Sequence, residues 1–392
     1  MYDFHKSVVY QCYFKSFYDS NGDGVGDLRG VTAKLDYLQK LGVDYIWLNP
    51  FFPSPQRDNG YDVADYCAVD PRFGTMEDFE ELSREAEKRG IRLMLDMVFN
   101  HTSTEHEWFQ KALAGDPDYE DYYIWREGGP DGTPPNNWES KFGGNAWQYV
   151  PEKGKWYLHL FDPTQADLNW ENPRVRKELQ NVIRFWMDKG VKGFRFDVVN
   201  LISKGSYESD DQGDGRRFYT DGPRVHEFLH VLNEATFGTD AEIITVGEMS
   251  STTMDNCYKY AGADTGELSM VFSFHHLKVD FVGNEKWVLV PFDFHKLKDI
   301  LADRYERPQR VERGVLVQPR PAARGLALRR RGRILEALGQ DAGHGHPLPA
   351  RHALRLSGRG NRHDQPGLYH ARPVPRRGKH QPLPHPARPR PA

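Results

Sequence analysis

Residues 193–200 read Gly-Phe-Arg-Phe-Asp-Val-Val-Asn, and this stretch decides the fold class. It has the apolar character of a short buried strand, yet Arg195 and Asp197 lie in it with one residue between them. Side chains alternate between the two faces of a strand, so these two charged groups share a face. Charges on a buried strand cost free energy unless they are paired or used. A structural ion pair and a functional site would both explain them.

Two further apolar stretches also contain or end in polar residues. Residues 95–101 read Leu-Asp-Met-Val-Phe-Asn-His, and residues 243–248 read Ile-Ile-Thr-Val-Gly-Glu. Segments with helical spacing separate the three stretches, which predicts βαβ units and a parallel sheet. If that sheet closes into a barrel, the C-terminal ends of its strands meet at one mouth. The residues expected to converge there are Asp96, His101, Arg195, Asp197 and Glu248.

In this order and spacing, the three stretches resemble the first three conserved motifs of the α-amylase superfamily of retaining glycoside hydrolases. The resemblance implies an α/β fold, a (β/α)8 TIM-type barrel. We expect about six βα units here, with a small domain inserted after strand three. The predicted domains are a first barrel part at 1–101, the inserted domain at 102–168, a second barrel part at 169–305 and a tail at 306–392.

The hydrophobic periods predict where the elements of the barrel lie. The expected strands cover residues 7–14, 45–48, 91–99, 193–200, 243–248 and 268–274. The expected helices cover residues 31–41, 76–88, 172–189, 223–235 and 294–305. Residues 102–168 lose this rhythm and are rich in Gly, Pro, Asn and Trp, and such long irregular insertions are usually functional. Their end, Gln-Ala-Asp-Leu-Asn-Trp at 165–170, is similar to the fifth motif of the oligo-1,6-glucosidase branch.

The resemblance assigns catalytic roles to Asp197 and Glu248. A retaining glycosidase needs two carboxyl groups about 5 Å apart, a nucleophile and an acid/base. Arg195 on the same face would favour the ionised form of Asp197, whereas Glu248 needs a more apolar pocket to hold its proton. The resemblance further implies that His101 hydrogen-bonds the bound sugar and that Asp96 supports the site.

The substrate is expected to be a small phosphorylated disaccharide. The turn at 58–62 needs no function, since Asn-Gly favours a turn, but the resemblance makes Asp58 and Tyr61 sugar-binding residues. The strings at 213–228, 247–253 and 274–280 are similar to the branch that cleaves trehalose 6-phosphate into glucose and glucose 6-phosphate. Phosphate requires nearby cations, and Lys278 and Lys286 are candidates, although either can be an ordinary surface lysine.

Two alternative functions stay open. One is an oligo-1,6-glucosidase or α-glucosidase, the neighbouring branch of the same superfamily. The other is a non-catalytic amylase-like binding or transporter-accessory protein. Relatives of the second kind lose their catalytic carboxylates, so the presence of Asp197 and Glu248 counts against it.

An acidic, Gly-rich loop near the N-terminus has the pattern of a calcium site. Oxygen donors alternate along residues 19–27, with a backbone carbonyl at one of the five positions, and such loops bind hard cations. A turn without any metal would show the same residues, but calcium-binding superfamily members carry this pattern, so we expect structural Ca²⁺. The predicted ligands are Asp19, Asn21, Asp23, Val25 and Asp27. No organic cofactor is expected.

Composition points to a cytoplasmic protein. The net charge of −4 does not suggest a nucleic-acid partner. Three cysteines, an odd and small number, fit a reducing compartment, and they are Cys12, Cys67 and Cys257. No signal peptide precedes the first predicted strand, and no run is long enough to cross a bilayer, so no membrane partner is expected.

Residues 306–392 have a different composition, crowded with Arg, Pro, Gly, Ala and His. They can be a disordered basic tail, but we favour translation out of frame. Residues 317–321 can be encoded GTG CAA CCA CGA CCA, and moving one nucleotide on gives Cys-Asn-His-Asp-Gln, the fourth superfamily motif. The same offset turns 360–367 and 378–384 into two further superfamily strings. Without the fourth-motif carboxylate, we expect the chain as written to be truncated and insoluble or inactive.

Overall fold

The computed structural model describes residues 7–261, 265–274, 279–282, 285–305, 315–317 and 355–356. Its centre is a parallel sheet of eight strands in the order β14-β11-β10-β9-β3-β2-β1-β15. These strands are β1 (Val9–Cys12), β2 (Tyr45–Leu48), β3 (Arg92–Met97), β9 (Gly193–Phe196), β10 (Ile244–Glu248), β11 (Met270–Ser273), β14 (Val315–Val317) and β15 (Arg355–Leu356). The predicted α/β class and the incomplete TIM-type barrel are confirmed.

The six predicted strands are all present, and most are shorter than the apolar runs that predicted them. Strands β14 and β15 were not predicted. Val315 pairs with Val271, and Arg355 pairs with Tyr10, so they extend the two edges of the sheet. Runs of three and two residues are too short for any hydrophobic period to reveal.

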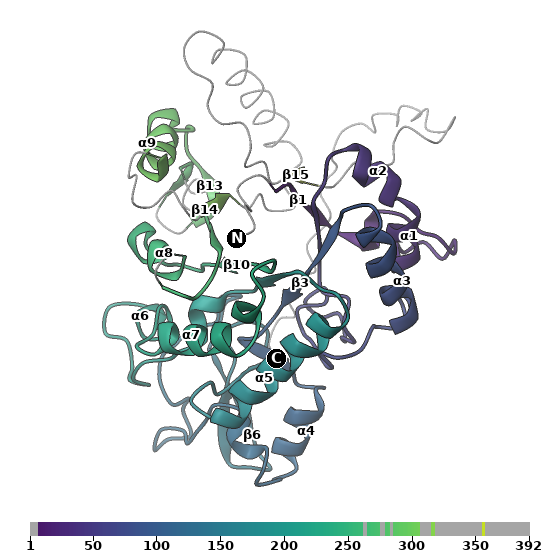
Figure 1. Ribbon diagram of the computed structural model, residues 1–392. Coiled ribbons are helices and arrows are strands. Elements are labelled where there is room, and N and C mark those ends of the chain that lie inside the picture. The colour runs from purple at the N-terminus through teal and green to yellow at the C-terminus, as the bar shows by residue number, and fades with distance from the viewer. Residues whose placement is uncertain are drawn as a thin grey trace, which may run out of the picture. The chain divides into compact units, whose positions relative to one another are not determined.

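Helices follow the strands around the sheet (Figure 1). Helix α3 begins at Thr75, whose hydroxyl forms a capping box with Asp78. The helix predicted over 31–41 is two short helices, because the backbone leaves helical geometry at Lys34. The helices that accompany the strands are α1 (Leu28–Ala33), α2 (Leu35–Lys40), α3 (Met76–Glu87), α5 (Pro173–Asp188), α7 (Val225–Ala235), α8 (Met254–Tyr260) and α9 (Phe294–Tyr305).

The inserted segment forms its own small sheets. Strands β5, β7 and β6 pair antiparallel, and β4 pairs antiparallel with β8, which places His101 opposite Asp167. The segment therefore leaves and rejoins the barrel at one place beside the end of β3. Its elements are β4 (His101–Ser103), α4 (Glu107–Leu113), η3 (Glu120–Tyr122), β5 (Trp125–Arg126), β6 (Trp147–Val150), β7 (Lys155–Leu158) and β8 (Gln165–Asp167).

The remaining elements lie in connections between the strands of the large sheet. They are η2 (Phe14–Ser16), η4 (Val199–Leu201), α6 (Arg216–Tyr219), η5 (Phe237–Thr239), β12 (Phe281–Val282) and β13 (Glu285–Leu289). Of these, η4 begins three residues after the end of β9, the strand that carries Arg195.

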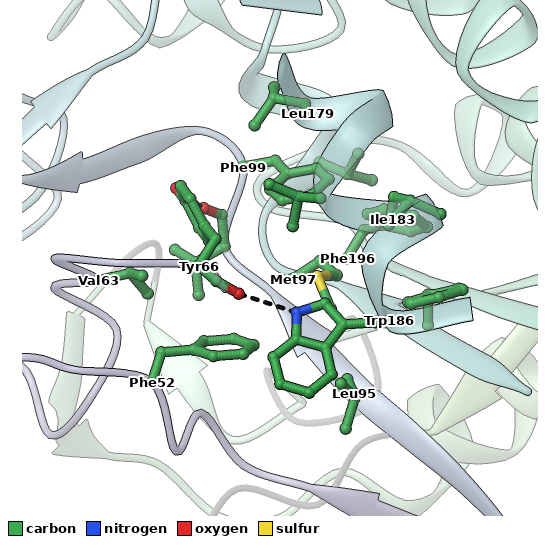
Figure 2. Packing of buried hydrophobic residues seen from close by; sticks show 14 of the residues in the cluster. Phe52, Val63, Tyr66, Leu95, Met97, Phe99, Leu179, Ile183, Trp186 and Phe196 are labelled. Atoms are coloured by element: carbon green, nitrogen blue, oxygen red, sulfur yellow. Dashed lines mark hydrogen bonds between the residues drawn. The ribbon is translucent and has the colours of Figure 1, made fainter. Parts of the chain in front are cut away.

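Trp186 of α5 is the centre of the packing between helices and sheet (Figure 2). It is fully buried, and its ring packs edge-on against Phe79 and Phe51, with centroids 4.8 and 5.6 Å away. Its indole N–H donates a hydrogen bond of 2.8 Å to the carbonyl of Tyr66. The buried indole therefore has packing partners for its ring and a hydrogen-bond acceptor for its N–H.

We predict that Trp186→Ala lowers the free energy of unfolding by about 3–5 kcal/mol, because it opens a large cavity. Urea unfolding followed by circular dichroism measures the loss. Trp186→Phe should lose less, since it keeps a ring. Phe142→Ala is the control, because that ring is 59% exposed and its removal should cost less than about 0.5 kcal/mol. Equal losses for the two alanine variants would contradict this account of the core.

Candidate active site

Three carboxyl groups meet on the guanidinium of Arg195. Strand pairing sets this up, since Arg195 of β9 lies opposite Asp96 of β3. Nη1 donates to Asp96 Oδ1 at 2.5 Å and to Asp197 Oδ1 at 2.6 Å. Nη2 forms an ion pair with Glu248 Oε2 at the end of β10. The structure therefore brings together the four charged residues expected at the barrel mouth.

Asp197 and Glu248 are close neighbours in this arrangement. Both contact terminal nitrogens of one guanidinium, which share a single carbon, so their bound oxygens lie within a few ångströms of each other. That is compatible with the spacing of about 5 Å at which a retaining mechanism operates. Asp197 is 8% exposed, and Glu248 keeps 15% of its side chain exposed. Both groups can thus be reached from solvent.

The charges of this cluster do not balance, because one cation faces three carboxyl groups. Burial raises the pKa of Asp96 to about 6, and Asp197 adds to the effect while Arg195 opposes it. Burial alone would lower the pKa of Arg195, but Asp96 and Asp197 raise it above its ordinary value. The guanidinium therefore stays charged, and the cluster can hold a proton near neutral pH.

Two aromatic side chains enclose the cluster. Trp47 Nε1 and the Tyr61 hydroxyl donate to Asp96 Oδ2 at 3.2 and 3.1 Å. Both rings also lie beside the Arg195 guanidinium, 5.2 and 5.8 Å from its carbon. Burial raises the pKa of Tyr61 well above its ordinary value, so its hydroxyl remains a donor. Tyr61 was predicted from the family resemblance, whereas Trp47 was missed, although it lies in a predicted strand.

Gln165 of β8 connects two of the predicted sugar-binding residues. Its amide nitrogen donates to Asp58 Oδ2 at 2.9 Å and lies 3.1 Å from His101 Nε2. Burial raises the pKa of Asp58 to about 6, with Gln165 opposing the rise, and burial lowers the pKa of His101. His101 is thus neutral at pH 7. This contact was not predicted, although Gln165 begins the string at 165–170 that is similar to the fifth motif.

Behind His101 lies a buried lysine that the sequence analysis did not single out. Lys204 Nζ forms an ion pair of 2.8 Å with Asp167 and donates to Asn100 Oδ1 at 2.9 Å. Asn100 in turn donates to Asp167 Oδ2 at 3.0 Å and lies 3.3 Å from His101 Nδ1. The ammonium therefore joins the inserted segment to the end of β3. Asp167 lies in the segment end that resembled the fifth motif, and this was the one available signal.

The proposed phosphate-binding lysines are not placed by the structure. Lys278 lies outside the described residues, and Lys286 lies in β13 with its side chain outside the described part. In the described part of the chain, no helix has the length and apolar character needed to cross a bilayer.

The loop at 19–27 lies on the surface. Asp19 accepts from the amides of Gly22 and Gly24, each at 2.7 Å, and Asp23 accepts from the amide of Val25 at 2.8 Å. Asp27 caps α1. The oxygen donors are of the kind that Ca²⁺ prefers. Across residues 7–261 and the shorter described segments, however, no three His, Cys, Asp or Glu side chains already form a metal-binding group.

The fold and the site define a class, an α/β barrel with paired carboxyl groups at the ends of neighbouring strands, as in glycoside hydrolases. The chain belongs to the alpha-amylase family. Its residues 11–317 match the family described as alpha amylase, catalytic domain. The match ends at Val317, where the hypothesis of a shifted reading frame locates the start of the fourth motif.

Individual relatives within the family differ in how similar they are to this chain. The chain is 61% identical over 294 residues to the trehalose-6-phosphate hydrolase of Escherichia coli K12, covering 75% of this chain and 53% of that protein. Identity to the oligo-1,6-glucosidase of Heyndrickxia coagulans is 48% over 308 residues, covering 76% and 55%. The crystal structure of Bacillus licheniformis trehalose-6-phosphate hydrolase matches with a TM-score of 0.76 and 54% identity, covering 80% and 56%. The chain thus spans about half the length of these relatives.

We predict that Lys204→Met lowers the free energy of unfolding by about 3–5 kcal/mol, because it leaves the buried Asp167 carboxylate without its cation. The double variant Lys204→Met/Asp167→Leu should recover part of this loss. Lys111→Met is the control, since it removes one partner of an exposed pair and should cost less than about 1 kcal/mol. A Lys204→Met variant as stable as the parent in urea would show that the ammonium does not hold the segment.

Proposed function

We propose that this chain holds most of the catalytic barrel of a retaining α-glucoside hydrolase that cleaves trehalose 6-phosphate into glucose and glucose 6-phosphate. One observation carries the reaction type, namely the contact of Arg195 with both Asp197 and Glu248. The substrate rests on the relatives, since trehalose-6-phosphate hydrolases are 61% and 58% identical and oligo-1,6-glucosidases 45–49%.

In the first step, Asp197 attacks the anomeric carbon of the non-phosphorylated glucosyl unit. The bond to the bridging oxygen breaks, and Glu248 gives that oxygen its proton, so glucose 6-phosphate leaves. In the second step, water attacks the glucosyl–Asp197 ester while Glu248 takes a proton from it. Glucose is released and both carboxyl groups return to their first state. Arg195 donates a hydrogen bond of 2.6 Å to Asp197 Oδ1 and so holds the nucleophile in position.

The residues around Asp197 and Glu248 would bind the substrate. Asp58 can accept hydrogen bonds from sugar hydroxyls. Neutral His101 and the Tyr61 hydroxyl would bind the same sugar. Lys278 and Lys286 remain our candidates for the phosphate. We call the protein translated in the original reading frame after about residue 305 the frame-restored chain, and the fourth-motif carboxylate would come from that part of it. Residues 318–320, which occupy this place in the present chain, are outside the described part.

The alternatives differ in what they require. An oligo-1,6-glucosidase would use the same pair of carboxyl groups on isomaltose, and the relatives with 45–49% identity support it less well. A non-catalytic binding protein would not need Asp197 and Glu248 both bound to Arg195. We further propose a cytoplasmic location, which the small and odd number of cysteines, three in the whole chain, supports.

We predict that the frame-restored chain hydrolyses trehalose 6-phosphate with a kcat/KM about 100-fold above that for isomaltose, because charge-assisted bonds to phosphate discriminate strongly. Asp197→Asn should lose at least about 10⁴-fold in kcat. Asp118→Asn, at a carboxylate that is 76% exposed, is the control and should match the parent. A coupled glucose assay measures all three. Preference for isomaltose would favour the oligo-1,6-glucosidase, and full activity of Asp197→Asn would exclude this mechanism.

We also propose that the loop of Asp19, Asn21, Asp23, Val25 and Asp27 binds a structural Ca²⁺. Positive φ at Gly22 and Gly24, +84° and +95°, allows the tight turns that a cation-binding loop of this length needs. Asp19 and Asp23 now accept backbone N–H groups. Rotation of their carboxylates toward a cation would complete the site, which lies apart from the barrel mouth.

Calcium at ten times its Kd should raise Tm by about 1–3 °C, because it binds only the folded chain. Differential scanning fluorimetry with CaCl2, MgCl2 and EDTA measures this on the 392-residue chain. Asp23→Asn should abolish the shift, whereas Asp118→Asn should keep it. Equal Tm values in calcium and in EDTA would show that the loop binds no calcium.

A further inference from the structure

One buried side chain joins the segment after Asp197 to the segment after Glu248. Asn200, in η4, is fully buried. Its Oδ1 accepts from the amide of Ser250 at 2.8 Å, and its Nδ2 donates to the carbonyl of the same residue at 2.9 Å. Ser250 lies two residues after Glu248, and Asn200 three residues after Asp197. A single amide therefore links the two chain segments that present the catalytic carboxyl groups.

Asp221 completes this link. The second N–H of Asn200 Nδ2 donates to Asp221 Oδ1 at 3.1 Å, and the amide of Asp221 donates to the Asn200 carbonyl at 2.9 Å. The Asp221 carboxylate also accepts from the Tyr260 hydroxyl at 2.6 Å and from Asn256 Nδ2 at 2.9 Å. Both of these residues belong to α8, so Asn200 is held against the helix that follows β10.

Residues with a strained backbone conformation lie next to the residues that make these contacts. Five non-glycine residues in the described chain have positive φ, and three of them are Val198, Asp221 and Ser251, at +35°, +52° and +56°. Positive φ is especially unfavourable for β-branched Val198, which directly follows Asp197. Such strain persists where surrounding contacts over-determine the backbone, and it is concentrated at functional sites. Asn200 and Asp221 supply contacts of that kind.

The Glu248 side chain needs such support. It lies at the last residue of β10, and its ion pair is with Arg195, which also contacts Asp96 and Asp197. An arginine shared among three carboxyl groups does not by itself set the position of any one of them. The Glu248 backbone pairs with Phe272 of β11, and directly beyond it Asn200 holds the chain at Ser250.

We propose that Asn200 is a positioning residue for the acid/base function of Glu248, with Asp221 holding Asn200 in place. The catalytic part of this inference rests on the hydrolase function proposed above. If Glu248 moves, proton transfer to the leaving oxygen suffers most. Substrates whose leaving group departs without a proton, such as p-nitrophenyl α-glucoside, should be far less affected. A merely structural role of Asn200 would lower the rates on both kinds of substrate equally.

Kinetics of Asn200→Ala in the frame-restored chain test this. We expect kcat for trehalose 6-phosphate to fall about 10–100-fold, as for small displacements of catalytic groups, with less than about threefold change in the glycosylation rate of p-nitrophenyl α-glucoside. Asp221→Asn should show the same pattern, with a larger fall in rate for trehalose 6-phosphate than for p-nitrophenyl α-glucoside. Asn136→Ala is the matched control, since Asn136 is a buried amide that bonds Tyr207 and Trp138 in a similar way. Equal losses on both substrates, or no loss, would overturn the proposal.

Hydrogen exchange on the 392-residue chain gives a readout that does not depend on activity. In Asn200→Ala, peptides covering 246–256 should exchange at least about tenfold faster, because the Ser250 amide loses its acceptor, while peptides from α3 keep the parent rate. Unchanged exchange at 246–256 would overturn the proposal. If the frame-restored parent hydrolyses no α-glucoside, the proposed function fails, and the exchange result still decides whether Asn200 holds this segment.

Discussion

The site depends on one interaction, the buried guanidinium of Arg195 among three carboxyl groups. Taking these charges out of water is costly, and removing Arg195 would leave three carboxyl groups without their cation. Asp96, Asp197 and Glu248 come from three adjacent strands, and parallel pairing in register brings their ends to Arg195. The register of the barrel strands therefore also determines the geometry of the site, because a shift of β9 by one residue would turn Arg195 away from its partners.

Around this centre lies a second layer of fixed polar groups, of which the inserted segment supplies Asp167 and Gln165. Lys204, Asp167 and Asn100 hold the back of His101, and Gln165 holds Asp58. On the other side, Asn200 and Asp221 hold the chain beyond Glu248. Both layers consist of buried, largely satisfied hydrogen bonds, which rigidify a site more than exposed ion pairs do. Rigid supports of this kind keep both carboxyl groups on Arg195, as the proposed double displacement requires.

The parts of the fold that sequence reasoning could predict are those with a strong local signal. Strand β2 and helix α9 have the predicted bounds, and Asp96, Arg195, Asp197 and Glu248 were placed together through strand order alone. Lys204, Trp47 and Asn200 had no such signal, because no strand-end pattern in the sequence links them to the partners that they contact 49–104 residues away. Only tertiary structure brings such partners together. Strands β14 and β15 were missed because two or three residues carry no period.

The central claim is that Asp197 and Glu248 are close enough on Arg195 for a covalent glucosyl intermediate rather than direct attack by water. Proton NMR of the first glucose released from p-nitrophenyl α-glucoside by the frame-restored chain tests this most directly. Two displacements at the anomeric carbon retain its configuration, so the account predicts α-glucose first, followed by slow mutarotation. β-Glucose as the first product would contradict it.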